Sequence, residues 1–131
     1  MKGVDTNILV RFLVGDDDRQ TKKVYTIFKQ AESAKNQLFV PLLVVLELLW
    51  VLDSVYSIPR NKILDCLSEL ILMPVLKFES HTTIQEFIST SQKSKHDLAD
   101  LLIAHSAISQ GCERIITFDK KAGRFELFES A

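Results

Sequence analysis

Residues 37–56 read QLFVPLLVVLELLWVLDSVY, and this stretch decides the fold class. Residues 37–40 form a short apolar run typical of a buried strand. Pro41 suits the first position of a helix over residues 42–56, because that position makes no use of an amide proton. The start of the chain has the same order, with a strand predicted for residues 2–4 and a helix after Thr6 or Asn7 as its cap. Two direct strand-to-helix passages indicate an α/β protein.

The rest of the chain continues this alternation. Apolar residues at helical spacing predict helices over 15–35, 60–71, 81–91 and 96–110, and residues 73–79 and 114–118 have the pattern of strands. No hairpin signal such as Asn-Gly joins the strands, so we expect a mostly parallel sheet with helices on both faces. The predicted architecture is a three-layer α/β/α sandwich.

Composition and charge narrow the class of protein further. A length of 131 residues predicts a single domain over residues 1–131, and 47% hydrophobic with 25% charged residues excludes a disordered chain. The net charge of -1 gives no general attraction to nucleic acid, so any such binding needs a local patch. Neither a secretory leader nor an apolar run of membrane-spanning length stands out. We therefore expect a soluble, cytoplasmic protein without a membrane partner.

Carboxylates stand at places where the pattern makes them unexpected. Asp5 and Asp119 follow the first and last of the strands above, and parallel strands would bring these ends to one edge. Glu47 interrupts a predicted helix that is apolar nearly all round, which favours a carboxylate directed at a metal. The alternative is a glutamate that faces solvent. It is disfavoured because such a helix is expected to leave little of its surface exposed. Asp97 and Asp100 share one face of a first helical turn, where capping is the alternative explanation. Asp100 is the stronger ligand candidate because it precedes the apolar residues 101–104.

Such a set of acids predicts a divalent metal site. Carboxylates brought together repel one another unless a cation compensates their charge. Oxygen ligands without matching His or Cys favour Mg²⁺, with Mn²⁺ as the alternative, over Zn²⁺. Ions of this kind act mostly on phosphates. Without these five acids, the chain has 12 acidic and 16 basic residues, so the rest of the protein is basic. The candidate contacts to a phosphate backbone are Arg11, Lys120, Lys121 and Arg124. The alternative is that these side chains are simply solvated.

Four segments in this order resemble the PIN-domain ribonucleases, and specifically the VapC-type toxins of prokaryotic toxin–antitoxin pairs. The segments are VDTNILVRFL (4–13), VLELLWVL (45–52), DLADLLIAHSA (97–107) and IITFDKKAGR (115–124). The resemblance implies a metal-dependent endonuclease for single-stranded RNA, often within tRNA or rRNA. It also implies a homodimer that is inhibited by a cognate antitoxin.

The resemblance further implies a role for individual residues. The acids that would hold Mg²⁺ or Mn²⁺ are Asp5, Glu47, Asp100 and Asp119. Asp97 would be an accessory acid, and the groups that would orient carboxylates or water are Thr6, Asn7 and Thr117. The expected reaction is attack of a metal-activated water on a phosphodiester, which leaves a 5′-phosphate and a 3′-hydroxyl.

Two other classes of function stay open at this point. A catalytically silent RNA- or protein-binding module on the same fold would bind without hydrolysis. A phospho-acceptor receiver domain is less favoured, because residues 73–79 hold no aspartate and Asp5 is followed by Thr6 and Asn7 rather than by a second acid. The three histidines lack metal-ligand spacing, so we expect them in capping, surface or core positions. For Trp50, packing is the expected role.

Overall fold

A computed structural model describes residues 1–131 except for the side chain of Arg124. The chain divides into two compact units, Met1–His81 and Thr82–Ala131. In the described part of the chain, no helix is both long and apolar enough to cross a membrane. Each unit is described in turn.

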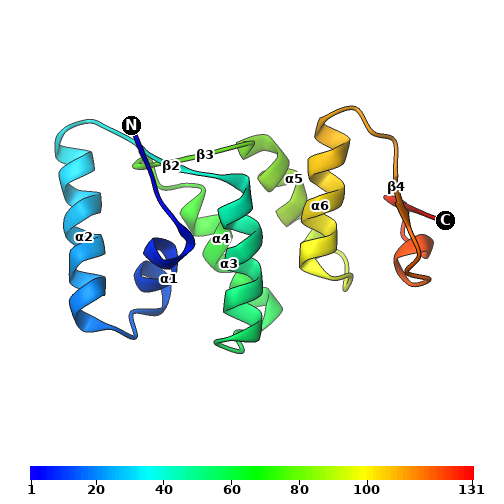
Figure 1. Cartoon of the computed structure of the whole chain (residues 1–131), viewed down its shortest axis with the longest axis horizontal. Helices are drawn as coiled ribbons and strands as arrows, with labels where there is room; N and C mark the ends of the chain where they lie inside the picture. The colour runs from blue at the N-terminus through cyan, green and yellow to red at the C-terminus, as the bar shows by residue number, and fades with distance from the viewer. The chain divides into compact units, whose positions relative to one another are not determined.

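The first unit is built on a three-stranded parallel sheet. Its strands are β1 (Lys2–Gly3), β2 (Leu38–Val40) and β3 (Leu76–Phe78), in the order β1-β2-β3. Leu38 in the middle strand pairs with Lys2 on one side and with Leu76 on the other. The helices are α1 (Thr6–Val14), α2 (Asp18–Ser33), α3 (Leu42–Ser54) and α4 (Arg60–Leu70), and Figure 1 shows β1 leading into α1 and β2 into α3. Both strand-to-helix passages predicted from the sequence are confirmed.

Two of the helix starts in this unit differ from the prediction. Asp5 rather than Thr6 or Asn7 is the N-cap of α1, where its carboxylate accepts a hydrogen bond from the Ile8 amide. Pro41 stands one position before α3 and brings no side-chain cap. The cap of α3 comes instead from Glu79, 37 positions after Leu42, whose carboxylate accepts a hydrogen bond of 2.9 Å from the Leu42 amide. A carboxylate at a helix N-terminus also suits the helix dipole.

The core of the first unit comes from one stripe on each helix. α1 packs against both α2 and α3, and α3 packs against α4. α2 buries only Val24 and Phe28; Ile27, which the spacing placed on the same face, is 39% exposed. The amphipathic pattern therefore predicted the helix correctly but made its buried face too wide.

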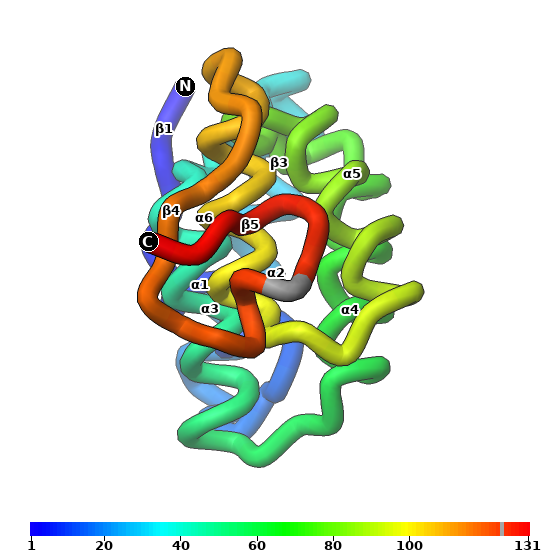
Figure 2. The backbone as a smooth tube through the Cα atoms, turned by 90° about the vertical axis from the view of Figure 1, so that its right-hand side faces the viewer, coloured from blue at the N-terminus to red at the C-terminus, as the bar shows by residue number. Residues whose placement is uncertain are grey.

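The second unit holds two helices and a separate pair of strands. Its elements are α5 (His81–Gln92), whose first residue closes the first unit, α6 (Leu98–Ser109), β4 (Ile115–Thr117), a 3₁₀ turn over Ala122–Arg124 and β5 (Phe128–Ser130). Gly111, with a φ of 97°, follows α6 as expected for the residue that ends this helix. β4 and β5 pair in parallel. Figure 2 labels both strands near the C-terminus. β5 was not predicted.

All strand pairs among the described residues are parallel, which confirms the α/β class. The strands pair in two sets, of three and of two, rather than in one continuous ladder. The predicted boundaries of α4, α5 and α6 hold to within a few residues. Alternation of short apolar runs with helical stripes was enough to find every helix.

Candidate metal centre

Asp5 and its neighbours open the first helix. Asp5 is exposed, and its Oδ1 lies 3.4 Å from the Ile8 amide nitrogen that it caps. Asn7 is exposed as well, whereas Thr6 is buried with only 5% of its surface accessible. The carboxylate therefore has one oxygen directed to the helix amides while the residue as a whole stays open to solvent.

Glu47 lies on an exposed stripe of α3, and the argument that used its burial was wrong. Leu43 is 78% exposed and Trp50 is 60% exposed. Together with the exposed Glu47, these two apolar residues form a solvent-facing stripe on α3, in which Glu47 is the charged member. The opposite stripe supplies the core through Val45, Leu48 and Leu52. The expectation that Trp50 packs was also wrong. A helix can be apolar all round and still lie at the surface, which composition alone does not reveal.

The second unit places Asp97 at the start of α6 as its N-cap. The carboxylate accepts a hydrogen bond of 3.0 Å from the Asp100 amide, and Asp97 is exposed. The capping explanation for Asp97 is confirmed. An accessory role toward a metal would therefore need the other carboxylate oxygen of Asp97, the one that does not cap the helix.

Asp100 is the most perturbed acid in the described chain. Its side chain is 42% exposed, and Oδ2 lies 3.5 Å from Nε2 of His96. Burial raises the pKa of Asp100 above its ordinary value, the charges of Asp97 and Asp119 raise this pKa further, and His96 acts in the opposite direction. Asp97 and Asp119 thus both act electrostatically on Asp100, and the clustering of the other acids stays a prediction. His96, for which a capping, surface or core position was expected, has an acidic partner in Asp100.

Asp119 is fixed by the turn that follows β4. Its Oδ1 accepts hydrogen bonds from the amides of Lys121 at 2.8 Å and Ala122 at 3.3 Å. Its own amide donates to Oγ1 of Thr117 at 3.0 Å. This turn sets the direction of the carboxylate two residues beyond the end of the strand. Thr117 contributes by orienting the backbone of Asp119 rather than its carboxylate.

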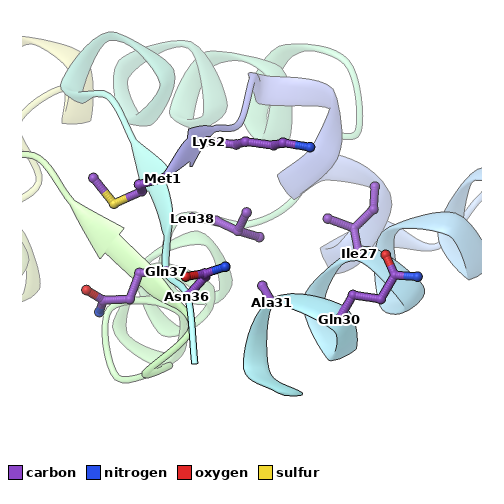
Figure 3. Close-up of a pocket in the computed structure, with 8 residues that line it drawn as sticks. All are labelled: Met1, Lys2, Ile27, Gln30, Ala31, Asn36, Gln37 and Leu38. Carbon is purple, nitrogen blue, oxygen red and sulfur yellow. The ribbon is translucent and has the colours of Figure 1, made fainter. Parts of the chain in front are cut away.

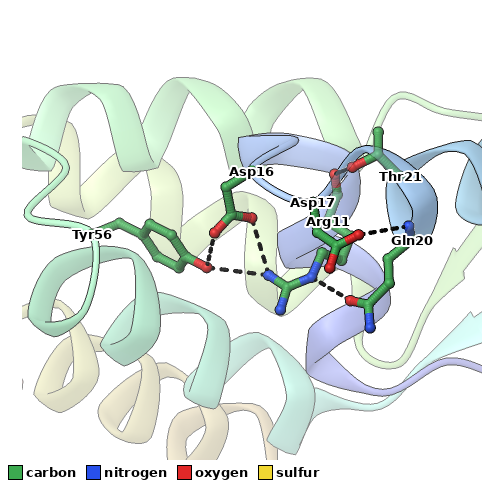
Figure 4. Close-up of polar contacts among 6 residues, drawn as sticks. All are labelled: Arg11, Asp16, Asp17, Gln20, Thr21 and Tyr56. Carbon is green, nitrogen blue, oxygen red and sulfur yellow. Dashed lines mark hydrogen bonds and ion pairs between the residues drawn. The ribbon is translucent and has the colours of Figure 1, made fainter.

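The four candidate cations differ in what they contact. Arg11 is bound by Asp16, Gln20 and Tyr56: its Nη1 lies 3.1 Å from Asp16 and 3.2 Å from the Tyr56 hydroxyl, and its Nε lies 2.6 Å from Gln20. Figure 4 shows this network, in which the Tyr56 hydroxyl also donates to Asp16. The bond with Tyr56 is the main reason that the pKa of Arg11 rises. Lys120 and Lys121 are exposed next to Asp119. The Arg124 side chain lies outside the described residues.

The donor set fits a hard divalent cation. All four proposed ligands are carboxylates, and oxygen donors are the ligands of Mg²⁺ and Mn²⁺. In the second unit, burial is the main cause of the raised pKa of Asp100 and the charges of Asp97 and Asp119 add to it, so a bound cation would favour its ionised form. Among the described residues, no three His, Cys, Asp or Glu side chains stand close enough together to form a ready-made ligand group.

A pocket of about 320 Å³ lies elsewhere in the first unit. Figure 3 shows that Ile27 and Ala31 of α2 form one wall, with Leu38 of β2 and Lys2 of β1 opposite. None of the acids discussed above is among the residues that line it. It therefore has no part in the candidate metal centre.

Comparison with known proteins adds an independent result. Residues 3–126 match the family model described as PIN domain, a range that extends across both compact units. The chain is also 25% identical over 121 residues to a protein of Aquifex aeolicus (strain VF5) named VapC ribonuclease, a match covering 92% of this chain and 89% of that protein. The resemblance that the four sequence segments indicated is confirmed.

Proposed function

Because this chain belongs to the PIN-domain family, we propose that it is a VapC-type toxin, a ribonuclease that hydrolyses RNA with the help of a divalent metal. Similarity to a protein named VapC ribonuclease over nearly the whole chain supports this activity. The observation that carries the proposal is Asp100, half-buried and subject to the charges of Asp97 and Asp119. The PIN match argues against the receiver-domain alternative.

The proposed ligands of Mg²⁺ or Mn²⁺ are Asp5, Glu47, Asp100 and Asp119. When bound, such an ion supplies a Lewis acid that lowers the pKa of a water and stabilises negative charge on a phosphodiester. The protein's own part is to hold the carboxylates. The α1 start holds Asp5, the turn amides of Lys121 and Ala122 hold Asp119, and the first turn of α6 holds Asp100. Asn7, Thr6 and Asp97 are proposed to assist them.

The proposed substrate is single-stranded RNA within tRNA or rRNA. Lys120 and Lys121 support this, because two exposed ammonium groups directly after Asp119 suit contact with phosphates. Arg11 would have to leave Asp16, Gln20 and Tyr56 to reach RNA, so we rank it below these lysines.

The proposed partners are a cognate antitoxin and a second copy of the chain, in the cytoplasm. Exposed apolar side chains support an interface of one kind or the other, since large hydrophobic groups at the surface are favoured where another protein covers them. Such exposed apolar side chains are Tyr25 and Ile27 on α2, and Leu72 just after the end of α4.

The test is cleavage of a total RNA pool by purified, antitoxin-free protein in Mg²⁺, Mn²⁺ or EDTA. The Asp100→Asn variant removes the central carboxylate, and Asp65→Asn, an exposed aspartate of α4, is the matched control. We expect metal-dependent fragments from the wild type and from Asp65→Asn, and none from Asp100→Asn. A folded wild type that binds RNA but never cleaves it would instead indicate the silent binding module.

A further inference from the structure

His96 is an aromatic side chain placed between two phenylalanines at the start of α6. Its ring stacks on Phe125 with a centroid distance of 5.7 Å and an interplanar angle of 8°, and it contacts Phe128 at 5.2 Å and 45°. Only 12% of the side chain is exposed. Its backbone amide donates to Ser94 Oγ at 3.0 Å. Ring and backbone are therefore both restrained, so the imidazole has little freedom to turn.

The restrained ring presents Nε2 to one oxygen of Asp100. The distance from Nε2 to Oδ2 is 3.5 Å, between two positions that are four apart in the sequence. Asp97 between them is occupied in capping the helix through the Asp100 amide. The carboxylate of Asp100 thus faces a ring that contacts Phe125, just after the 3₁₀ turn, and Phe128 of β5.

We propose that His96 is a positioning residue for Asp100: the ring fixed between Phe125 and Phe128 sets the direction of that carboxylate for a divalent cation. This inference rests on the proposed function, because it assigns Asp100 to the metal. A carboxylate already fixed in one rotamer loses less conformational freedom when a cation binds than a freely rotating one. Partners that orient metal-ligating groups typically change metal affinity by about 10- to 100-fold when they are removed.

The position of His96 also explains why the segment after β4 matters for the acids. Phe125 lies directly after the 3₁₀ turn and Phe128 opens β5, so the same stretch that follows Asp119 also clamps the ring beside Asp100. One short segment therefore controls the orientation of two carboxylates.

The test is calorimetric titration of Mn²⁺ into the full-length protein without RNA, with thermal melting of each variant. His96→Phe keeps an aromatic ring between the phenylalanines and removes the nitrogen that faces Asp100. His96→Gln keeps an N–H donor without the ring. His81→Gln is the control, because His81 is exposed and its ring contacts the Ile71 carbonyl rather than an acid. Asp100→Asn reports on the metal site itself.

We expect His96→Phe to melt like the wild type and to bind Mn²⁺ about tenfold more weakly. His96→Gln should recover part of that loss, and His81→Gln should bind as the wild type does. The Mn²⁺ concentration for half-maximal RNA cleavage should rise in His96→Phe, while the rate at saturating Mn²⁺ stays near that of the wild type.

The failures are distinguishable. If Asp100→Asn loses Mn²⁺ binding and His96→Phe keeps full affinity, the positioning role is overturned and the metal site stands. If His96→Phe melts at a lower temperature than the wild type, the comparison with His96→Gln decides. Equal losses of Mn²⁺ affinity in the two variants overturn the positioning role, and a smaller loss in His96→Gln supports it. If the wild type binds no Mn²⁺, or Asp100→Asn binds it normally, the metal site is overturned and the positioning role with it.

Discussion

The two compact units carry their acids in different ways. In the first, Asp5 and Glu47 are exposed, one as the cap of α1 and the other on the open face of α3. In the second, the charges of Asp97 and Asp119 act on Asp100, which is half-buried and paired with His96. The difference teaches that repulsion among the acids, which a bound cation would relieve, acts in the second unit. Asp5 and Glu47 of the first unit are instead exposed to solvent and stay proposed ligands.

The largest effect should come from Asp100. Asp100→Asn removes a carboxylate whose pKa is raised, so the ionised form is less favoured in the folded chain than in the unfolded one. We therefore expect RNA cleavage to fall by at least about a hundredfold, and the melting temperature in the absence of metal to hold or rise. A fall in cleavage that only tracks a fall in melting temperature would contradict this account.

Asp5 separates a capping role from a metal role. Asn is as good an N-cap as Asp, so Asp5→Asn should melt like the wild type and still lose cleavage. Asp5→Ala should lose cleavage and also about 1 kcal/mol of unfolding free energy. Chemical denaturation gives the stability and an RNA assay gives the activity. Full activity in a folded Asp5→Asn protein would exclude Asp5 as a ligand of the metal.

Glu47 tests whether an exposed acid on an apolar stripe acts in the same way. Glu47→Gln should lose cleavage without loss of stability, because the side chain faces solvent. Glu69→Gln, an exposed glutamate of α4, is the matched control and should leave both unchanged. Equal activity in the two variants would count against Glu47 as a ligand.

A smaller effect belongs to the polar network of the first unit. The Tyr56 hydroxyl contacts both Asp16 and Arg11. Tyr56→Phe should lower the unfolding free energy by about 1 kcal/mol and leave cleavage per folded molecule unchanged. Tyr25→Phe, an exposed ring on α2, serves as the control. A loss of RNA affinity in Tyr56→Phe would show that Arg11 has a role beyond this network.

The smallest effect concerns pH. His105 is buried, its Nε2 lies 3.0 Å from Thr90 Oγ1, and burial lowers its pKa although Glu86 opposes the shift. The unfolded chain therefore binds the proton more readily, and stability should fall as the pH drops from 7 through the ordinary histidine value of about 6.5. His105→Gln should reduce this dependence in melting experiments, and His81→Gln should not. An equal pH dependence in wild type and His105→Gln would exclude His105 as its source.

Local pattern was enough for the helices and for most strands, because apolar spacing records burial along one element at a time. It missed β5: FES at residues 128–130 has only Phe128 buried, and its partner β4 is itself mostly accessible. It also gave Glu47 the wrong environment, since an apolar helix says nothing about which of its faces the fold leaves uncovered.

The candidate site divides along the same line. The acids were chosen from their positions in the sequence and from the family resemblance, and their role as ligands stays a prediction. The capping role of Asp97 was anticipated as an alternative and is confirmed. His96 was missed as a partner of Asp100, although the predicted helix over residues 96–110 set the two residues four positions apart on one helical face. Its partners Phe125 and Phe128 lie about thirty residues away and come to it only through the fold.

The most direct test of the central claim is Mn²⁺ titration of the wild type, Asp5→Asn, Asp100→Asn and the double variant. If Asp5 and Asp100 are ligands of one cation, each single variant should abolish the same binding event, and the double variant should lose no more than either single one. Unchanged Mn²⁺ binding in Asp5→Asn, or losses that simply add in the double variant, would contradict the account.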